Sequence, residues 1–257
     1  MDLGLKGKKA IVTGGTRGIG RAIAETLAAE GCDVAICARN ADQIADAVKA
    51  MSAAHGTKVW GAVADISNAD SLKGFIGDAA KELGGIDVLV SNASALAIGN
   101  TEAAWKSGFD IDIMGAVRSV EAALPELKKS AAANGDAAII AIGSVSSVSA
   151  TDASAYGAVK GAMVHLVKGL AKELAGEHVR ANVVSPGTVY FEGGVWHMVE
   201  ENMPDMFKAT MARNPMGRMA TPQDIANATA FLASPKSSFT TGINMIVDGA
   251  ITDRVNY

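Results

Sequence analysis

The sequence predicts a doubly wound α/β fold, in which helices cover both faces of a seven-stranded, mostly parallel sheet. Short apolar runs without alternation are typical of strands that are buried on both faces. These runs alternate along the chain with longer helical patterns, as a parallel sheet requires. The length of 257 residues and the 49% hydrophobic content suit one large domain, which we assign to 1–257.

In the first half of the chain, four predicted strands are each followed by a predicted helix. The strands are the apolar runs 9–13, 33–38, 58–63 and 87–91, and the helical patterns cover 18–30, 42–54, 71–83 and 101–129. Gly31 is expected to end the first helix, since glycine readily adopts the left-handed conformation of a helix end. Pro125 is expected to bend or end the fourth helix, because proline lacks the N–H that a helix interior needs.

The second half contains the predicted strands 137–142, 179–184 and 243–247 and the predicted helices 153–175 and 221–233. Thr-Pro opens the last helix and is a typical start signal. Between these elements lies one long irregular stretch, 187–218, which holds Gly193, Gly194 and several methionines. Irregular segments of this length are usually functional, so we expect a substrate lid here, called the lid segment below.

Composition excludes several classes of function. The net charge of -4 and the pI of about 5.6 argue against nucleic acid as a partner, since phosphate binding needs a basic face. No apolar run approaches the length of a membrane span, and no signal peptide fits before the first strand. Cys32 and Cys37 match neither a metal site nor a disulfide framework, so we expect no metal and a reducing cytoplasm.

A glycine-rich turn joins the first strand to the first helix. Its sequence from Thr13 to Gly20 is TGGTRGIG. Free N–H groups and the helix dipole at such a helix start attract phosphate, and glycines let the backbone approach it closely. Because strand and helix lie on the expected sides, the turn predicts a dinucleotide site rather than a turn without a ligand.

Tyr156 and Lys160 are four residues apart on a predicted helix and therefore share one face. An ammonium beside a phenol stabilises the phenolate, which makes the phenol a proton donor near neutral pH. Ser144, at the end of the fifth strand, can donate a hydrogen bond to the same substrate oxygen. The spacing alone leaves open a solvated surface pair, which is the more ordinary interpretation.

The Gly-x-x-x-Gly-x-Gly spacing of the turn resembles the short-chain dehydrogenase/reductase family, and further motifs follow in the family's order along nearly the whole chain. They include ADIS with Asp65, SNAS at 91–94, Ser144 with the Tyr-x-x-x-Lys of 156–160, and SPGTV at 185–189. Three C-terminal stretches, GRMATPQDIA, FLAS and TGINMIVDG, also resemble family elements. The resemblance implies a Rossmann-like fold and hydride transfer between nicotinamide and a carbonyl or secondary alcohol.

The resemblance also implies roles for individual residues. Tyr156 would act as the acid or base, Ser144 would orient the substrate oxygen, and Lys160 would assist Tyr156 and hold the nicotinamide ribose. The implied cofactor contacts are Gly14, Thr16, Arg17, Gly18, Ile19, Gly20, Arg39, Asn40, Asp65, Ile66, Asn92, Ala93, Tyr156, Lys160, Pro186, Gly187 and Val189.

The end of the second strand indicates which nicotinamide cofactor is bound. An acidic residue there would accept hydrogen bonds from the adenosine ribose and repel a 2′-phosphate. This chain has Ala38 instead, followed by Arg39 and Asn40, and Arg17 is expected nearby. Two guanidinium groups without a carboxylate favour NADP(H), the alternative being that both arginines are solvated surface residues.

One motif departs from the family pattern. The family carries Asn-x-x-Gly on the helix after the fourth strand, whereas this chain has DIMG at Asp112–Gly115. An ionised carboxylate accepts hydrogen bonds but donates none, and it would pair with Lys160 or disturb it. We expect Asp112 to be a fourth member of the proton relay. The alternative is a tolerated exchange at a position where only backbone geometry matters.

The substrate is predicted less sharply than the reaction. Ser144, Ser146, Tyr156 and Trp196 are the candidate contacts, with Ser146 and Ser147 as substitutes or assistants for Ser144. His197 is either a further contact or part of the lid surface, and Met198, Met203, Met206 and Met211 are expected to form an adaptable apolar lid.

An apolar ketone is the expected substrate. The chain also resembles 3-oxoacyl-carrier-protein reductases, and Lys128, Lys129 and Lys172 are candidates to meet an acidic carrier. A non-catalytic NADP-binding regulator is the alternative from another class. By analogy with the family, a homotetramer is expected.

Overall fold

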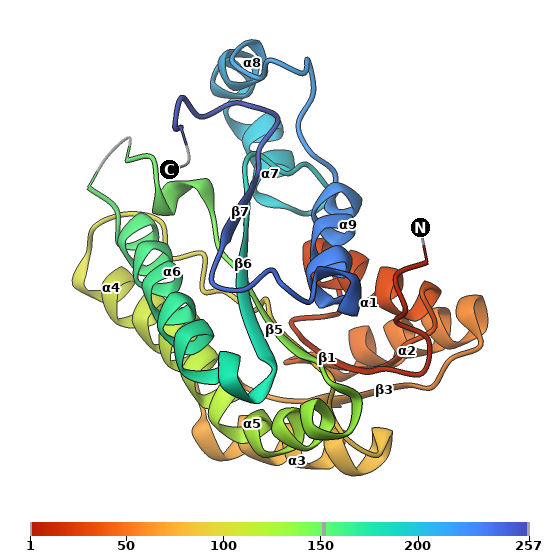
Figure 1. Ribbon diagram of the computed structural model, residues 1–257. Coiled ribbons are helices and arrows are strands. Elements are labelled where there is room, and N and C mark those ends of the chain that lie inside the picture. Colours follow the sequence, from red (N-terminus) through yellow and green to blue (C-terminus); the bar gives the residue numbers. More distant parts are fainter. Residues whose placement is uncertain (1, 151–152, 256–257) are drawn as a thin grey trace.

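Seven parallel strands form one sheet in the order β3-β2-β1-β4-β5-β6-β7 (Figure 1). The computed structural model describes residues 2–150 and 153–255. The strands are β1 (Lys9–Thr13), β2 (Asp33–Ala38), β3 (Val59–Val63), β4 (Val88–Ser91), β5 (Ala137–Ile142), β6 (Val179–Pro186) and β7 (Asn244–Val247). The predicted fold class is confirmed. The sheet was predicted to be mostly parallel, and in the described residues all of its strand pairs are parallel.

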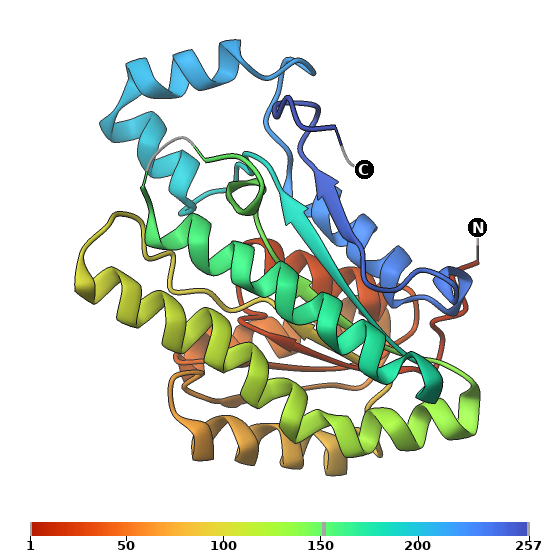
Figure 2. The ribbon, with the colours of Figure 1, turned by 60° about the vertical axis from the view of Figure 1, so that its left-hand side comes forward.

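Helices cover both faces of the sheet (Figure 2). One face carries α1 (Gly18–Ala29), α2 (Ala41–His55) and α9 (Pro222–Ala233), and the other carries α3 (Ala69–Leu83), α5 (Gly115–Asn134) and α6 (Ala155–Leu174). Each face has its own cluster of buried apolar side chains. The strand order reverses between β1 and β4, and such a reversal opens a crevice at the carboxyl ends of the strands.

The predicted helix 101–129 is built from three segments. It consists of α4 (Glu102–Gly108), a π-helical turn (Phe109–Met114) and α5. Pro125 was expected to bend or end this helix, and the expectation that it ends there is wrong, because α5 continues through Pro125 to Asn134. Pro125 and Glu121 both lie on the exposed side of α5. The Glu121 carbonyl, which loses its N–H partner at the proline, can therefore be hydrated.

The lid segment was expected to be one long irregular stretch, and this expectation is wrong. It contains α7 (Val195–Asn202) and α8 (Pro204–Ala212). Only Val199 of α7 is buried, and no residue of α8 is. The two helices are also short, with eight and nine residues, so they offer little periodic pattern by which a helix is found in a sequence.

The two ends of the lid segment are joined. Val189 and Ala220 form a parallel bridge, in which the N–H of Tyr190 donates to the Ala220 carbonyl at 2.9 Å. The N–H of Ala220 donates in turn to the Thr188 carbonyl at 2.9 Å. The segment thus leaves the domain and returns at one point, and α8 stands clear of the sheet in both views (Figures 1 and 2).

A buried ion pair fixes the opposite end of the sheet. Arg180 in β6 holds Asp136, with Nε–Oδ1 and Nη2–Oδ2 distances of 2.6 and 3.0 Å. The same guanidinium donates to the carbonyls of Leu232 and Ser234 at the end of α9. Its remaining donors are thus satisfied, which is what a buried charge requires. Within the described residues, no helix has the length and apolar character that crossing a membrane requires.

Candidate active site

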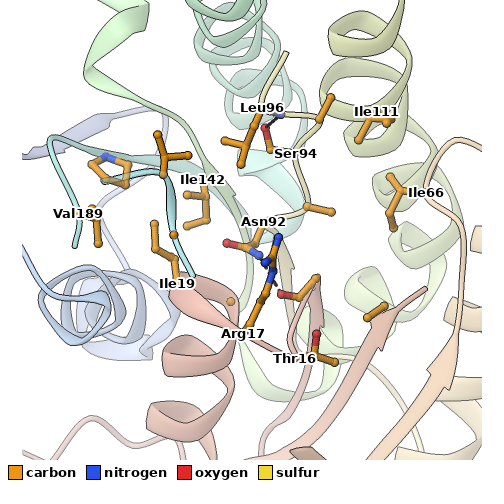
Figure 3. A pocket seen from close by; sticks show the side chains of 18 of the residues that line it. Thr16, Arg17, Ile19, Ile66, Asn92, Ser94, Leu96, Ile111, Ile142 and Val189 are labelled. Carbon is orange, nitrogen blue, oxygen red and sulfur yellow. Dashed lines mark hydrogen bonds between the residues drawn. The ribbon is translucent and has the colours of Figure 1, made fainter. Parts of the chain in front are cut away.

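A cleft of about 810 Å³ opens at the carboxyl ends of the strands. Its wall comes from the turn after β1, the ends of β2, β5 and β6, the loops after β3 and β4, the region from α4 to the π-helical turn, the start of α6, and the lid segment. Figure 3 shows it from close by, with Arg17 and Ile19 at the start of α1, Asn92 after β4, and Leu96 and Ile111 beyond them. This is the crevice that the reversed strand order predicts.

The glycine-rich turn is folded as a close-packed cradle. Gly14 and Gly18 have φ of +67° and +54°, the left-handed region that favours glycine. A Cβ on Gly20 would lie 2.2 Å from the Gly14 carbonyl oxygen and 2.4 Å from Asn92 Nδ2. Asn92 also donates to the Thr13 carbonyl at 2.9 Å, so the loop after β4 braces the turn.

The start of α1 offers unpartnered N–H groups to the cleft. The N-cap residue is Arg17, no side chain caps the helix, and the first turn contains no acidic residue. Such a helix start is positively polarised and binds phosphate. The cradle and this helix start therefore fit the pyrophosphate of a dinucleotide.

Two arginines lie in the wall of the cleft, one in the turn after β1 and one after β2. Arg17 and Arg39 line the cleft and are exposed. Within the described chain, the arginines that form ion pairs are others, namely Arg21, Arg118, Arg180 and Arg218. Asp65 lies in the same wall, and hydrogen bonds from Ser67, with a smaller contribution from the charge of Arg39, lower its pKa. The two guanidinium groups are thus available to a phosphate.

The predicted catalytic residues meet in the middle of the cleft. Ser144 follows β5 and is buried, with its Oγ accepting the Ser146 N–H at 3.1 Å. Tyr156 lies in the first turn of α6, and Lys160 Nζ is 5.7 Å from the centre of its ring. The Nζ also donates to the Ile142 carbonyl at 2.9 Å, which draws Lys160 inward until only 2% of it is exposed. The pair is therefore not a solvated surface pair.

Asp112 lies behind Lys160, in the π-helical turn. Its Oδ1 is 2.9 Å from Lys160 Nζ, and its Oδ2 accepts the Ala95 N–H at 2.9 Å. The Oδ1 contact lacks hydrogen-bond geometry, so it is an ion pair held by charge alone. The sequence left open whether this carboxylate pairs with Lys160 or disturbs it, and in the structure the two side chains form a pair.

Three predicted residues are not part of the cleft wall. Ser146 lies in the 3₁₀ turn after Ser144, Asp112 lies behind Lys160, and Gly18 is covered by Phe191. The substrate contact through Ser146 stays a prediction. In the structure, the Ser146 backbone N–H orients Ser144.

The side of the cleft opposite the cofactor cradle is apolar, and several of its residues were not predicted from the sequence. Leu96 and Ile111 form one wall, and Phe191, Trp196 and Met198 of the lid segment form the other. A Cβ on Gly18 would lie 2.5 Å from the Phe191 ring, so this ring contacts the glycine-rich turn. Loops that follow the strands of a parallel sheet line such a crevice. This rule could have identified the unpredicted wall residues from the sequence.

His197 belongs to the lid rather than to the cleft wall. Its Nδ1 accepts the Gly193 N–H at 3.1 Å, and its ring meets the edge of Tyr190 at 6.1 Å between ring centres. Tyr190 in turn donates to Glu200, and this acceptor raises the pKa of Tyr190. His197 is therefore accounted for by contacts within the lid segment.

Cys37 also lines the cleft, but its thiol is not a nucleophile. Burial raises its pKa to about 12, so that the reactive thiolate is scarce at neutral pH. In the part of the chain that the structure describes, no group of three or more His, Cys, Asp or Glu side chains is placed to hold a metal ion.

Known proteins are similar to this chain over almost its full length. A family model described as "Enoyl-(Acyl carrier protein) reductase" matches residues 14–252. Isoepoxydon dehydrogenase of Penicillium expansum is 35% identical, over 98% of this chain and 97% of that protein. The rhamnolipids biosynthesis 3-oxoacyl-[acyl-carrier-protein] reductase of Pseudomonas aeruginosa is also 35% identical, over 95% of this chain and 96% of its own length.

Two solved structures are similar as well. L-sorbose reductase from Gluconobacter frateurii, complexed with NADPH and L-sorbose, matches with a TM-score of 0.89 and 27% identity, over 99% of this chain and 100% of that one. The RhlG/NADP active-site complex of Pseudomonas aeruginosa matches with a TM-score of 0.86 and 33% identity, over 97% and 98% of the two chains.

Proposed function

Because the chain belongs to the short-chain dehydrogenase/reductase family, we propose that it is an NADP(H)-dependent ketoreductase with an apolar ketone as its substrate. It reversibly interconverts a carbonyl and a secondary alcohol. The observation that supports this most is the shared cleft. Ser144, Tyr156 and Lys160 face the same crevice as the phosphate cradle, so a substrate and a nicotinamide can meet there.

The cleft residues account for each part of the cofactor. The turn with Gly14, Thr16, Ile19 and Gly20 would hold the pyrophosphate, and Arg17, Arg39 and Asn40 would hold the 2′-phosphate. Asp65 and Ile66 would contact the adenine, and Asn92, Ala93, Pro186, Gly187 and Val189 would surround the nicotinamide half. Two solved relatives carry NADPH or NADP, which supports this cofactor. When bound, NADPH supplies the hydride that reduces the carbonyl carbon.

Three side chains handle the proton and the charge. Tyr156 gives its proton to the carbonyl oxygen as that oxygen becomes an alkoxide. Ser144 donates a hydrogen bond to the same oxygen and stabilises the developing charge. The Lys160 ammonium stabilises the tyrosinate that remains. In alcohol oxidation the proton moves in the reverse direction.

The substrate half of the cleft favours an uncharged ketone. Leu96, Ile111, Phe191, Trp196 and Met198 supply its apolar surface. The charged side chains of the described wall are only Arg17, Arg39, Asp65 and Lys160, each of which is assigned to the cofactor or to the proton transfer. A charged substrate group would find no partner there. The lid segment 187–218 closes this half.

A 3-oxoacyl-carrier-protein reductase is the second candidate, which the Pseudomonas relative favours. An acidic carrier needs a basic surface beside the cleft. The lid segment carries four exposed acidic residues, Glu192, Glu200, Glu201 and Asp205, against exposed Lys208 and Arg213 and an Arg218 that is paired with Asp224. On α5, Lys128 is already paired with Glu177 and Lys129 with Glu126, and the third candidate, Lys172, is exposed in the last turn of α6, the end opposite Tyr156. These charges favour a free ketone over a carrier-bound thioester.

A substrate panel tests the proposal. Consumption of NADPH is followed with uncharged cyclic and aromatic ketones, and with one 3-oxoacyl group presented on N-acetylcysteamine, on coenzyme A and on a carrier protein. NADH is run in parallel. We expect the best uncharged ketone to exceed the carrier-bound thioester in kcat/KM by at least about tenfold, a difference of about 1.4 kcal/mol.

Two outcomes would contradict the proposal. A preference for the carrier-bound thioester would make the second candidate correct. NADPH binding, seen by fluorescence, without turnover of any compound would point to a non-catalytic regulator.

We also place the protein in the cytoplasm as a homotetramer. Both cysteines are free thiols, as a reducing compartment requires. Trp105 and Phe109 in the α4 region, and Phe239 before β7, expose large apolar side chains that association would cover. Light scattering of the purified protein gives its mass in solution, and a monomer would contradict the tetramer.

A further inference from the structure

We propose that Asp112 sets the pH range of the reductase by offsetting the charge of Lys160, an inference that rests on the proposed function because it needs Tyr156 as the proton donor. With the carboxylate in place, Tyr156 keeps its proton to a higher pH than a neutral residue at position 112 would allow. Asp112 is thus a positioning residue that acts through Lys160, without contact with substrate or cofactor.

The two charges form a closed pair inside the protein. Asp112 Oδ1 and Lys160 Nζ are 2.9 Å apart, and their side chains are 1% and 2% exposed. Solvent and salt therefore screen the pair little, and each charge acts on its neighbours as part of a nearly neutral unit.

Both partners are fixed by the backbone around them. The Ala95 N–H donates to Asp112 Oδ2, and Lys160 Nζ donates to the Ile142 carbonyl, each at 2.9 Å. The π-helical turn Phe109–Met114 aims Asp112 inward, and such turns are frequent at functional sites. Gly115 closes this turn against Ile66, since a Cβ there would lie 2.4 Å from Ile66 Cγ2. The carboxylate thus has little freedom to leave Lys160.

No other buried carboxylate of the described chain faces this pair. Asp87 holds Lys8 and Asp136 holds Arg180, both at other places in the fold. The loop after β4, the ends of β5 and β6 and the turn after Ser144 carry no charged side chain at the pair. The one phenol beside it is that of Tyr156.

The charged groups on the helices packed against the pair are engaged elsewhere or exposed. Asp110 pairs with Arg118 at 2.9 Å, and Glu102 pairs with Lys106. The other titratable side chains on α5 and α6 lie on the outer surfaces of these helices. These are Glu121, Glu126, Lys128, Lys129, His165, Lys168, Lys172 and Glu173. Among the carboxylates on these helices, Asp112 is therefore the one whose removal most changes the charge beside Tyr156.

The sign of the effect follows from the charges. A tyrosinate next to an unopposed ammonium is favoured, and a carboxylate behind that ammonium removes part of the advantage. Carbonyl reduction needs the protonated phenol, so its rate falls as the phenol ionises at high pH. Replacing Asp112 by a neutral residue should move this alkaline limb of the pH profile to lower pH. Alcohol oxidation needs the tyrosinate, so its acid limb should move in the same direction.

The test compares Asp112→Asn with wild type across pH, using the best ketone of the panel for reduction and its alcohol for oxidation. We expect both limbs of kcat/KM to move down by about one pH unit. Asp110→Asn is the matched control, since it removes the same charge two residues away, and its limbs should stay in place. Limbs of Asp112→Asn that coincide with those of wild type, or that move to higher pH, would overturn the proposal.

A second set of variants covers the case in which Asp112→Asn does not fold. Asp112→Ser is also neutral and keeps an oxygen for the Ala95 N–H. Lys160→Met leaves the carboxylate buried alone, whereas Asp112→Asn with Lys160→Met leaves no buried charge. The double variant should therefore melt about 5 °C or more above Lys160→Met alone. Equal melting temperatures would refute the coupling of the two buried charges.

The wild type separates this inference from the proposed function. If none of the ketones in the panel is reduced by the wild type with NADPH, the proposed function fails, and there is no pH profile to compare. If it is active while every Asp112 variant keeps the wild-type limbs, the function stands and the role of Asp112 is refuted.

Discussion

We propose that two guanidinium groups, those of Arg17 and Arg39, favour NADPH over NADH. Arg39 follows β2 where an acidic residue would select NADH, and Arg17 is the N-cap residue of α1. An Arg–phosphate contact is a charge-assisted pair of about 1.5–3 kcal/mol. Arg39→Ala should therefore raise the KM for NADPH by at least about tenfold and leave that for NADH within about threefold.

Lys49→Ala is the control for this prediction. It removes the same charge from an exposed position on the next helix, α2, and should alter neither KM. An Arg39→Ala enzyme whose two KM values rise together would show that Arg39 acts on the whole adenosine half and not on the 2′-phosphate.

Single residues differ in how far the sequence could predict them. Tyr156 and Lys160 share a helix, so their spacing and the family motif were sufficient. Whether Asp112 pairs with Lys160 was left open, because Lys160 lies on another helix and only the fold brings the two together. Ser146 was proposed as a substrate contact because it is close to Ser144 in sequence. The 3₁₀ turn after Ser144 directs its backbone N–H to the Ser144 oxygen.

At the scale of elements, the strand–turn–helix unit from β1 to α1 depends on Gly20. A side chain there would meet the Gly14 carbonyl at 2.2 Å, and backbone cannot give way as a flexible side chain does. Gly20→Ala should weaken NADPH binding by about tenfold or more and destabilise the domain by about 1–3 kcal/mol.

Gly77→Ala is the matched control, measured by the same NADPH titration and thermal melt. Gly77 lies within α3, where a Cβ would meet nothing within 4 Å. Alanine there should leave NADPH affinity unchanged and stabilise the helix by about 0.5–1 kcal/mol. A Gly20→Ala variant that behaves like Gly77→Ala would contradict the tight cradle.

Elements were predicted best where the apolar pattern is strong. The bounds of β1, β2 and β5 agree with the predicted ones, since these strands are almost wholly buried. The helices α7 and α8 were missed because nearly all of their residues remain in contact with solvent. The helix does not end at Pro125, because the carbonyl that loses its N–H partner lies on the exposed side of α5, where water can hydrate it.

At the scale of the whole molecule, the site is a product of the sheet topology. The parallel strands all end at one edge, and the reversal between β1 and β4 opens the cleft at that edge. Residues of the glycine-rich turn, the loop after β4, the end of β5 and the start of α6 therefore meet, although they are distant in sequence. The order of the motifs predicted this meeting. The apolar wall of the substrate half depends on lid packing, which the sequence alone does not indicate.

The central claim is that Tyr156 delivers the proton in an NADPH-dependent reduction. Turnover of the best ketone and the Kd for NADPH, from fluorescence titration, should be measured together for wild type and Tyr156→Phe. We predict that kcat falls by about 10²–10⁴-fold while the Kd stays within about threefold, because only the hydroxyl is lost. Turnover within about tenfold of wild type, or loss of NADPH binding together with turnover, would contradict the assignment.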